Sequence, residues 1–262
     1  MKIALFFKKP VMLYAQGIGP VRGIKAREAV QKVLQRVSVI GVRDRDSKAE
    51  LMDMGVTRPP IHVTADAVLS MHPVDKPSAF RFWSKRELPA AAGASALPSG
   101  NLAGPSAYKD AIAQAADTLQ QREDVDIIFI PMQHPEDVAA GRDIADRMKT
   151  RAIVLDDRYS TVEFMSLMGC MDAVVANRLH ALIFSALMET PATAISYDPK
   201  IDSFIHLIGD RVCGTTESVT AEALAPASVN SWPRGDSSRP SRPASTICAA
   251  SPCEMPTWPC AS

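Results

Sequence analysis

The sequence predicts an α/β protein built from two Rossmann-like parallel sheets, of which the N-terminal one is incomplete. Short apolar strands alternate with amphipathic helices, and connections of a few residues join most of them, as in parallel βαβ units. The alternation stops at one proline-rich stretch and then resumes, which divides the pattern into two pieces. With 262 residues and a hydrophobic content of 47%, the chain can bury a real core, so global disorder is excluded.

The first piece, residues 1–75, is expected to be the remnant of an N-terminal Rossmann-like domain. Apolar runs at 11–17, 37–42 and 61–65 predict strands, and an apolar stripe over 25–36 predicts a helix. Ser47 and Glu50 fit a capping box, which predicts that the next helix begins there and ends near Gly55.

The second piece, residues 106–225, is expected to form a C-terminal Rossmann-like domain. A capping box at Ser160 and Glu163 marks the start of one of its helices. Its predicted strands lie at 126–131, 152–155, 172–176 and 192–197, and its predicted helices at 107–122, 136–149, 162–168, 179–188 and 200–208.

Two stretches lack the pattern. Residues 76–105 combine prolines with an alanine run and show neither a helical nor a strand period, which predicts an irregular linker. Residues 226–262 contain seven of the 20 prolines and three of the five cysteines, and we expect a disordered tail there. Both stretches have the bias toward Pro, Ser, Ala and Arg of a gene translated out of register, so we hypothesise a frameshift.

Composition excludes several function classes. The 29 Lys and Arg residues balance the 29 Asp and Glu residues, which argues against general nucleic-acid binding and against a polybasic membrane surface. The apolar runs fall far short of the roughly 20 residues that span a bilayer, and the N-terminus lacks the features of a secretory signal. The cysteines have no metal-ligand spacing, so we expect a reduced, cytoplasmic protein without a disulfide framework or a metal site.

Polar side chains follow the ends of several predicted strands, where open parallel sheets bind their ligands. Arg43 follows the strand at 37–42, Gln133 and His134 follow the strand at 126–131, and Lys200 follows the last. The segment Arg178–His180 opens a helix that is otherwise almost wholly apolar. Arginine can hold a carboxylate or phosphate through two parallel hydrogen bonds, and histidine can donate or accept a proton near neutral pH. These residues predict a site for a small anion.

A purely structural interpretation of the same residues stays open. Arg178 could pair with Asp172 or Asp198, and His180 could cap the strand end, because perturbed groups also occur in structural networks. Arg43 could belong to a helix start of alternating charge, and the lysine after the last strand could be solvated.

Five segments, in this order along the chain, resemble the polysaccharide pyruvyl transferases of the CsaB type. They are Tyr14–Pro20, Gly41–Asp44, Val63–Asp66, Arg178–His180 and Ser196–Lys200. The resemblance extends over residues 1–72 and 106–215. It implies a two-domain fold like that of the GT-B glycosyltransferases. It also implies a transferase that moves a pyruvyl group from phosphoenolpyruvate to a sugar of a cell-wall polysaccharide precursor, forming a pyruvate ketal.

The resemblance also implies roles for individual residues. His180 is expected to perform general acid/base catalysis, and Arg178 is expected to act beside it on the donor. The expected substrate-binding residues lie at the strand ends and are Arg43, Leu179, Lys200, Gln133 and His134. Phosphoenolpyruvate is then the donor substrate, with no cofactor, and the acceptor is a glycan or a lipid-linked oligosaccharide that would bring the enzyme into peripheral contact with a membrane.

Two other interpretations stay open. The first is a GT-B glycosyltransferase with a nucleotide-sugar donor, which would need an acidic residue or a glycine-rich loop for ribose and diphosphate in the C-terminal half. The second is a non-catalytic fragment of a pyruvyl transferase. Members of the family open with a strand and a glycine-rich loop, whereas the first residues here resemble the end of a helix, so we expect an N-terminally truncated and frameshifted fragment.

Overall fold

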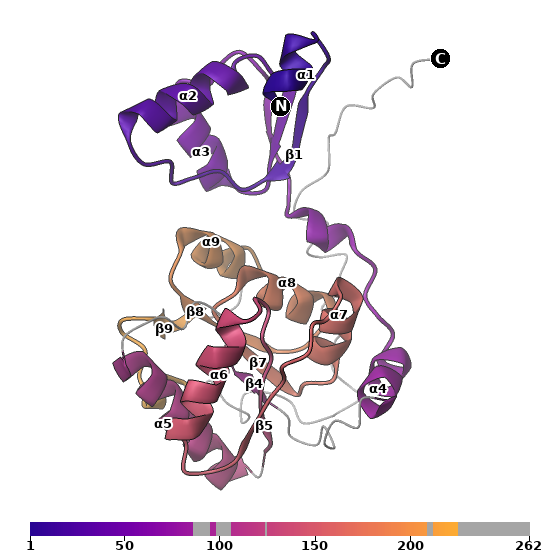
Figure 1. Ribbon diagram of the computed structural model, residues 1–262, viewed down its shortest axis with the longest axis vertical. Helices are drawn as coiled ribbons and strands as arrows, with labels where there is room; N and C mark the ends of the chain where they lie inside the picture. Colours follow the sequence, from indigo (N-terminus) through magenta and orange to yellow (C-terminus); the bar gives the residue numbers. More distant parts are fainter. Residues whose placement is uncertain (86–94, 98–105, 124, 209–211, 225–262) are drawn as a thin grey trace. The chain divides into compact units, whose positions relative to one another are not determined.

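The computed structural model describes residues 1–85, 95–97, 106–123, 125–208 and 212–224. These residues form two compact units, Met1–Met71 and a second unit that begins at His72 (Figure 1). Each unit contains a wholly parallel sheet flanked by helices, which confirms the predicted α/β class with two Rossmann-like pieces. No helix within these residues is long and apolar enough to cross a membrane.

The first unit is built on a three-stranded parallel sheet. Its strands lie in the spatial order β1 (Met12–Gln16), β2 (Val39–Val42) and β3 (Ile61–Val63), close to the predicted ranges. Its helices are α1 (Lys2–Phe6), α2 (Ile24–Leu34), α3 (Arg45–Asp53) and the 3-10 turn η1 (Ala67–Ser70). The buried core of this unit comprises Leu13, Leu34, Val37, Ile40, Val42, Leu51, Met54 and Val56.

Helix α3 begins earlier than the sequence predicts. Its N-cap is Asp44, whose Oδ1 accepts a hydrogen bond from the Ser47 N–H at 2.6 Å. The capping box predicted for Ser47 and Glu50 is therefore wrong. Both side chains instead accept hydrogen bonds from the loop after β1, Ser47 from the Ile18 N–H at 2.8 Å and Glu50 from the Val21 N–H at 3.0 Å.

The second unit is built on a six-stranded parallel sheet. Its strands lie in the spatial order β6 (Ala152–Val154), β5 (Ile127–Phe129), β4 (Ser95–Leu97), β7 (Ala173–Ala176), β8 (Ala192–Ser196) and β9 (Val212–Thr215). Its helices are α4 (Lys76–Lys85), α5 (Ser106–Glu123), α6 (Glu136–Arg147), α7 (Thr161–Gly169), α8 (Leu179–Leu187), α9 (Pro199–Ile208) and α10 (Ala221–Leu224). The capping box predicted at Ser160 and Glu163 is confirmed at the start of α7.

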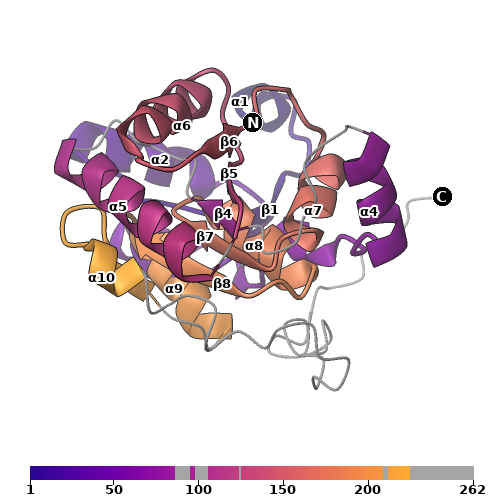
Figure 2. The same ribbon diagram turned by 90° about the horizontal axis from the view of Figure 1, so that it is seen from below.

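The strand order of this sheet determines where a ligand can bind. Counted from β4 in chain order, the spatial order is 3-2-1-4-5-6, that of a doubly wound fold. Right-handed crossovers place α5 and α6 on one face, and α7, α8 and α9 on the other. Accordingly, α5 packs against α6 and α10, while α7 packs against α4 and α8 (Figure 2). The direction of winding reverses between β4 and β7, so the carboxyl ends of these strands form the expected binding crevice.

The segment at 76–105, expected to be an irregular linker, contains two regular elements. Helix α4 packs on α7 and buries Ala79 and Trp83, which lie one helical turn apart. Strand β4 pairs with both β5 and β7, and it is too short to show a period in the sequence. The remainder of this segment and the tail at 226–262 lie outside the described residues.

Candidate functional site

The predicted motif Arg178–His180 lies where β7 passes into α8, beside the reversal of winding. Arg178 is the N-cap residue of α8, but its side chain makes no capping hydrogen bond. No side chain of the described residues accepts a hydrogen bond from the first-turn N–H groups of α8, and the helix dipole places partial positive charge there. This arrangement favours the binding of an anion.

The turn before α8 is anchored in the core by a polar contact. Asn177 is fully buried, and its Nδ2 donates to the Tyr108 hydroxyl at 3.4 Å. Burial, with a smaller contribution from Cys213, raises the pKa of Tyr108 well above its usual range, although the hydrogen bond from Asn177 opposes the shift. Tyr108 is thus held as a neutral phenol beneath the site.

The guanidinium of Arg178 is held by residues from the opposite side of β4. Its Nη2 donates to Asp137 Oδ1 and to Gln133 Oε1, each at 2.9 Å. Asp137 belongs to the first turn of α6 and is only 2% exposed. Its other oxygen accepts hydrogen bonds from the N–H groups of Met132 at 3.1 Å and Gln133 at 2.8 Å. The structure thus brings together two of the predicted residues, Gln133 and Arg178, and adds Asp137.

Arg178 retains donors that no described residue uses. Its Nε is buried without a hydrogen-bond acceptor, and Nη1 has no acceptor among the described residues. The structural interpretation of Arg178 anticipated Asp172 or Asp198 as its partner, but the partner is Asp137. The pairing occupies Nη2 and Nε is buried, so Nη1 is the donor that remains for a ligand.

The two predicted histidines of this edge differ in how they are held. His134 Nε2 lies 2.8 Å from the backbone oxygen of Asp156, and because a carbonyl only accepts, Nε2 carries the hydrogen. The neutral ring of His134 therefore presents Nδ1 as a proton acceptor. His180 is the one exposed residue of α8, with its ring centroid 6.4 Å from that of Phe184. Leu179 is buried, so only its backbone could contact a ligand.

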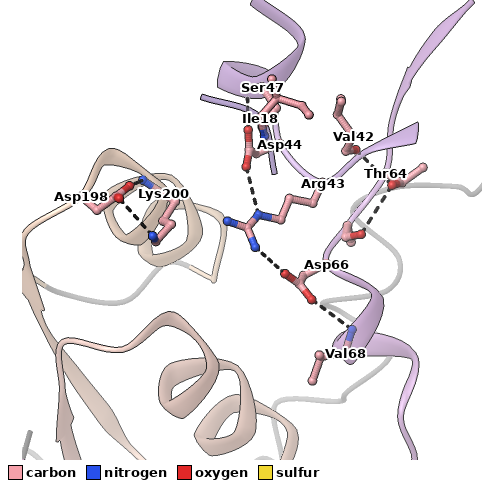
Figure 3. Close-up of polar contacts among 11 residues, drawn as sticks. Ile18, Val42, Arg43, Asp44, Ser47, Thr64, Asp66, Val68, Asp198 and Lys200 are labelled. Atoms are coloured by element: carbon pink, nitrogen blue, oxygen red, sulfur yellow. Dashed lines mark hydrogen bonds and ion pairs between the residues drawn. The ribbon is translucent and has the colours of Figure 1, made fainter. Parts of the chain in front are cut away.

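Lys200, predicted to support substrate binding, forms an ion pair at the end of β8. Its Nζ lies 3.0 Å from Asp198 Oδ2 (Figure 3). The same Nζ lies 5.6 Å from the centroid of the Tyr197 ring. Asp198 Oδ1 also accepts the Lys200 N–H at 3.0 Å. The lysine is therefore held against the β8 end rather than freely solvated.

Arg43, predicted to bind substrate, belongs to the first unit and lies between two carboxylates (Figure 3). Its Nη1 donates to Asp66 at 2.9 Å, and its Nε lies 3.5 Å from Asp44, an ion-pair distance without hydrogen-bond geometry. Asp44 and Asp66 also cap α3 and η1. A Cβ on Gly17 would lie 2.6 Å from the guanidinium, so Arg43 packs directly against that glycine.

Each predicted cation of these sites is thus paired with a carboxylate that sequence reasoning had not assigned to it. The signal for Asp137 was its place in the first turn after the strand at 126–131, where Gln133 and His134 were already candidates. Within the described ranges, no group of three or more His, Cys, Asp or Glu side chains is arranged to hold a metal ion.

A family model for polysaccharide pyruvyl transferases matches residues 1–199 of the chain. No curated protein matches the sequence.

Solved structures of nucleotide-sugar enzymes share its fold. S. aureus MnaA in a co-structure with UDP is 12% identical, with a TM-score of 0.62 over 86% of this chain and 60% of that one. UDP-GlcNAc 2-epimerase from Methanocaldococcus jannaschii gives the same identity and TM-score over 86% and 64%. Anabaena Alr3699/HepE in complex with UDP and glucose is 14% identical, with a TM-score of 0.59 over 94% and 68%. The chain thus spans less than two thirds of the length of the first two, and the likeness shows a GT-B-like fold.

Proposed function

The chain belongs to the polysaccharide pyruvyl transferase family, and we propose that it transfers a pyruvyl group from phosphoenolpyruvate to a sugar of a cell-wall polysaccharide precursor. One observation carries the proposal. At the end of β7, the guanidinium of Arg178 keeps unused donors beside the uncapped N-terminus of α8 and the exposed His180. A carboxylate or phosphate is the chemical group that such donors bind best.

The reaction must balance protons between donor and acceptor. A proton adds to the methylene carbon of phosphoenolpyruvate, which becomes a methyl group and leaves an oxocarbenium-like centre at C2. Two hydroxyl oxygens of the sugar form bonds to C2, and the C2–O bond to phosphate breaks. The sugar hydroxyls lose two protons, of which one replaces the proton delivered to carbon and the other leaves with inorganic phosphate. The products are a pyruvate ketal and hydrogen phosphate.

Arg178 is the proposed donor-binding residue of the second unit. Because Asp137 balances its charge, Arg178 would contribute directed hydrogen bonds from Nη1 more than net positive charge. The exposed Gln133, which accepts from Nη2, could be displaced by a ligand oxygen at the same position. Lys200 is proposed as a further contact to the anionic donor in the second unit, and Arg43 is proposed separately as a substrate-binding residue of the first unit.

The proton transfers are assigned to the histidines of this edge. His180 is exposed in the first turn of α8, the turn at which we propose that the donor binds, so we assign it general acid/base catalysis. His134 presents an unprotonated Nδ1 in its neutral form and would assist binding from the β5–α6 loop. No cofactor takes part in this scheme, and the acceptor is a glycan, met at a membrane surface when it is lipid-linked.

The test is transfer of labelled pyruvyl groups from phosphoenolpyruvate to an acceptor containing N-acetylmannosamine, with phosphate release measured in parallel. We expect Arg178→Ala to raise the KM for phosphoenolpyruvate and His180→Ala to lower kcat by roughly 100-fold or more. His206→Ala is the matched control, because His206 is also an exposed helical histidine of the second unit but lies in α9.

The alternatives give different outcomes in the same preparation. Thermal stabilisation by UDP-sugars and not by phosphoenolpyruvate would indicate a nucleotide-sugar glycosyltransferase. A chain that is stabilised by neither ligand would be a non-catalytic member of the family. Equal transfer rates in wild type, Arg178→Ala and His180→Ala would refute the assignment of the site.

A further inference from the structure

Asp137 is the most buried charged side chain at this edge of the sheet, and neither the motif nor the family resemblance includes it. Its carboxylate is 2% exposed and accepts three hydrogen bonds. Two come from the backbone of the β5–α6 loop, and the third comes from Arg178, which is 41 positions away in sequence. Asp137 thus connects the loop that carries Gln133 to the start of α8.

We propose that Asp137 is a positioning residue that orients the Arg178 guanidinium for donor binding, an inference that rests on the proposed function. An arginine side chain has several freely rotating bonds, and ordering it on binding a ligand costs conformational entropy. Asp137 orders it in advance by fixing Nη2, and the two loop N–H groups fix Asp137 in turn.

The choice of carboxylate follows from this geometry. One oxygen serves the loop and the other serves Arg178, so a side chain with a single acceptor cannot satisfy both. Asp137→Asn has the same shape but keeps one acceptor and no charge. In this variant the single amide oxygen would accept either the hydrogen bonds from the loop N–H groups or the one from the guanidinium. Without a fixed acceptor, the Arg178 side chain would sample several orientations.

Asp117 provides a matched control in the same unit. It is also a buried aspartate, 8% exposed, and it also accepts two backbone N–H groups, those of Lys149 and Thr150. Its hydrogen-bond partners among the described residues are Lys149 and Thr150, and Arg178 is not one of them. Asp117→Asn therefore removes a buried carboxylate that holds backbone N–H groups without changing the orientation of Arg178.

The experiment has two readouts on the full chain. The first is the side-chain ¹⁵N NMR signal of the Arg178 Nη groups, assigned by its absence in Arg178→Lys, and it does not depend on any ligand. The second is phosphoenolpyruvate binding measured by calorimetry in a double-mutant cycle of Asp137→Asn and Arg178→Ala. We expect Asp137→Asn to broaden the Arg178 signal and weaken binding about tenfold, while the same change has less than about a twofold effect when Arg178 is already alanine.

The results separate this inference from the proposed function. An unchanged Arg178 signal in Asp137→Asn overturns the positioning role, as does equal weakening by Asp117→Asn or an additive cycle. If wild type binds no phosphoenolpyruvate, the proposed function fails, and the NMR comparison of the two Asn variants alone decides whether Asp137 orients Arg178.

Discussion

Arg43 is expected to stabilise the first unit even in the absence of any ligand, and the variant Arg43→Ala measures this contribution. The substitution removes the 2.9 Å hydrogen bond to Asp66 and the 3.5 Å ion pair with Asp44, and leaves both carboxylates largely buried at helix N-termini. A hydrogen bond between charged groups contributes about 1.5–3 kcal/mol, and the longer ion pair contributes less. Each carboxylate keeps one backbone N–H donor, which limits the loss. We expect the free energy of unfolding of this unit to fall by about 2–3 kcal/mol.

The suitable assay is hydrogen exchange measured by mass spectrometry. Tryptophan fluorescence would not report on this unit, because the three tryptophans all lie outside residues 1–71, at Trp83, Trp232 and Trp258. The amide of Ile40, which donates to the Pro60 carbonyl at 3.0 Å, reports on the centre of the sheet. A loss of about 2–3 kcal/mol would accelerate its exchange roughly 30- to 150-fold if exchange follows unfolding of the unit.

Arg45→Ala is the matched control for this prediction. Arg45 lies two positions after Arg43, and its side chain is exposed at the start of α3. The substitution also removes one positive charge, and it should change the free energy of unfolding by less than about 0.5 kcal/mol. Equal exchange rates in the two variants would refute the structural role. If Arg43→Ala weakens phosphoenolpyruvate binding without accelerating exchange, the arginine acts on the ligand alone.

Two further predictions concern acid stability and backbone conformation. Burial acts to raise the pKa of Asp117, but its hydrogen bonds with Thr150 and with backbone N–H groups outweigh that effect and lower the pKa. The ionised carboxylate of Asp117 therefore stabilises the folded state at pH values above its unfolded pKa of about 3.9, and this stabilisation is lost as the pH falls through the lower pKa of the folded state. Between pH 6 and 2, the Tm should therefore fall less steeply in Asp117→Asn than in wild type. Gly19 and Gly23 both have positive φ, +92° and +88°, and alanine at either should destabilise the first unit by about 1–3 kcal/mol. The larger loss is expected at Gly19, where a Cβ would lie 2.7 Å from Glu50, because nothing lies within 4 Å at Gly23; equal losses in urea unfolding would contradict this ordering.

Local patterns in the sequence predicted most elements, and they failed where partners distant in sequence decide the outcome. A serine followed three residues later by a glutamate predicted a capping box at two places, Ser47 and Ser160. At Ser160 it forms a capping box, whereas at Ser47 both side chains bond to a loop 29 positions earlier. The sequence pattern is the same in both places, so only the fold of the loop after β1 distinguishes them.

The candidate site was predicted only in part, because one of its contacts joins residues that are distant in sequence. The strand-end argument found Arg178 and Gln133, which do contact each other. It could not find Asp137 as the partner of Arg178, because β4, three residues long and hidden in a proline-rich stretch, had to be placed between β5 and β7 first. Two strand spacings amount to roughly 10 Å, a gap that an arginine and an aspartate together can bridge. The almost wholly apolar composition of the helix predicted at 179–188 likewise indicated that α8 is buried, but not that His180 would be its one exposed residue.

The pairing of each strand-end cation with a carboxylate has a kinetic consequence. Arg43, Arg178 and Lys200 each form an ion pair with an aspartate. At a distance of roughly 10 Å, which is the Debye length, the electrostatic potentials of the two opposite charges of each pair nearly cancel. These pairs would therefore exert little long-range attraction on an approaching small anion such as phosphoenolpyruvate, and they would recognise it only at hydrogen-bonding distance. Its association rate should then change little with ionic strength, unlike that of an enzyme whose site carries a strong net positive charge.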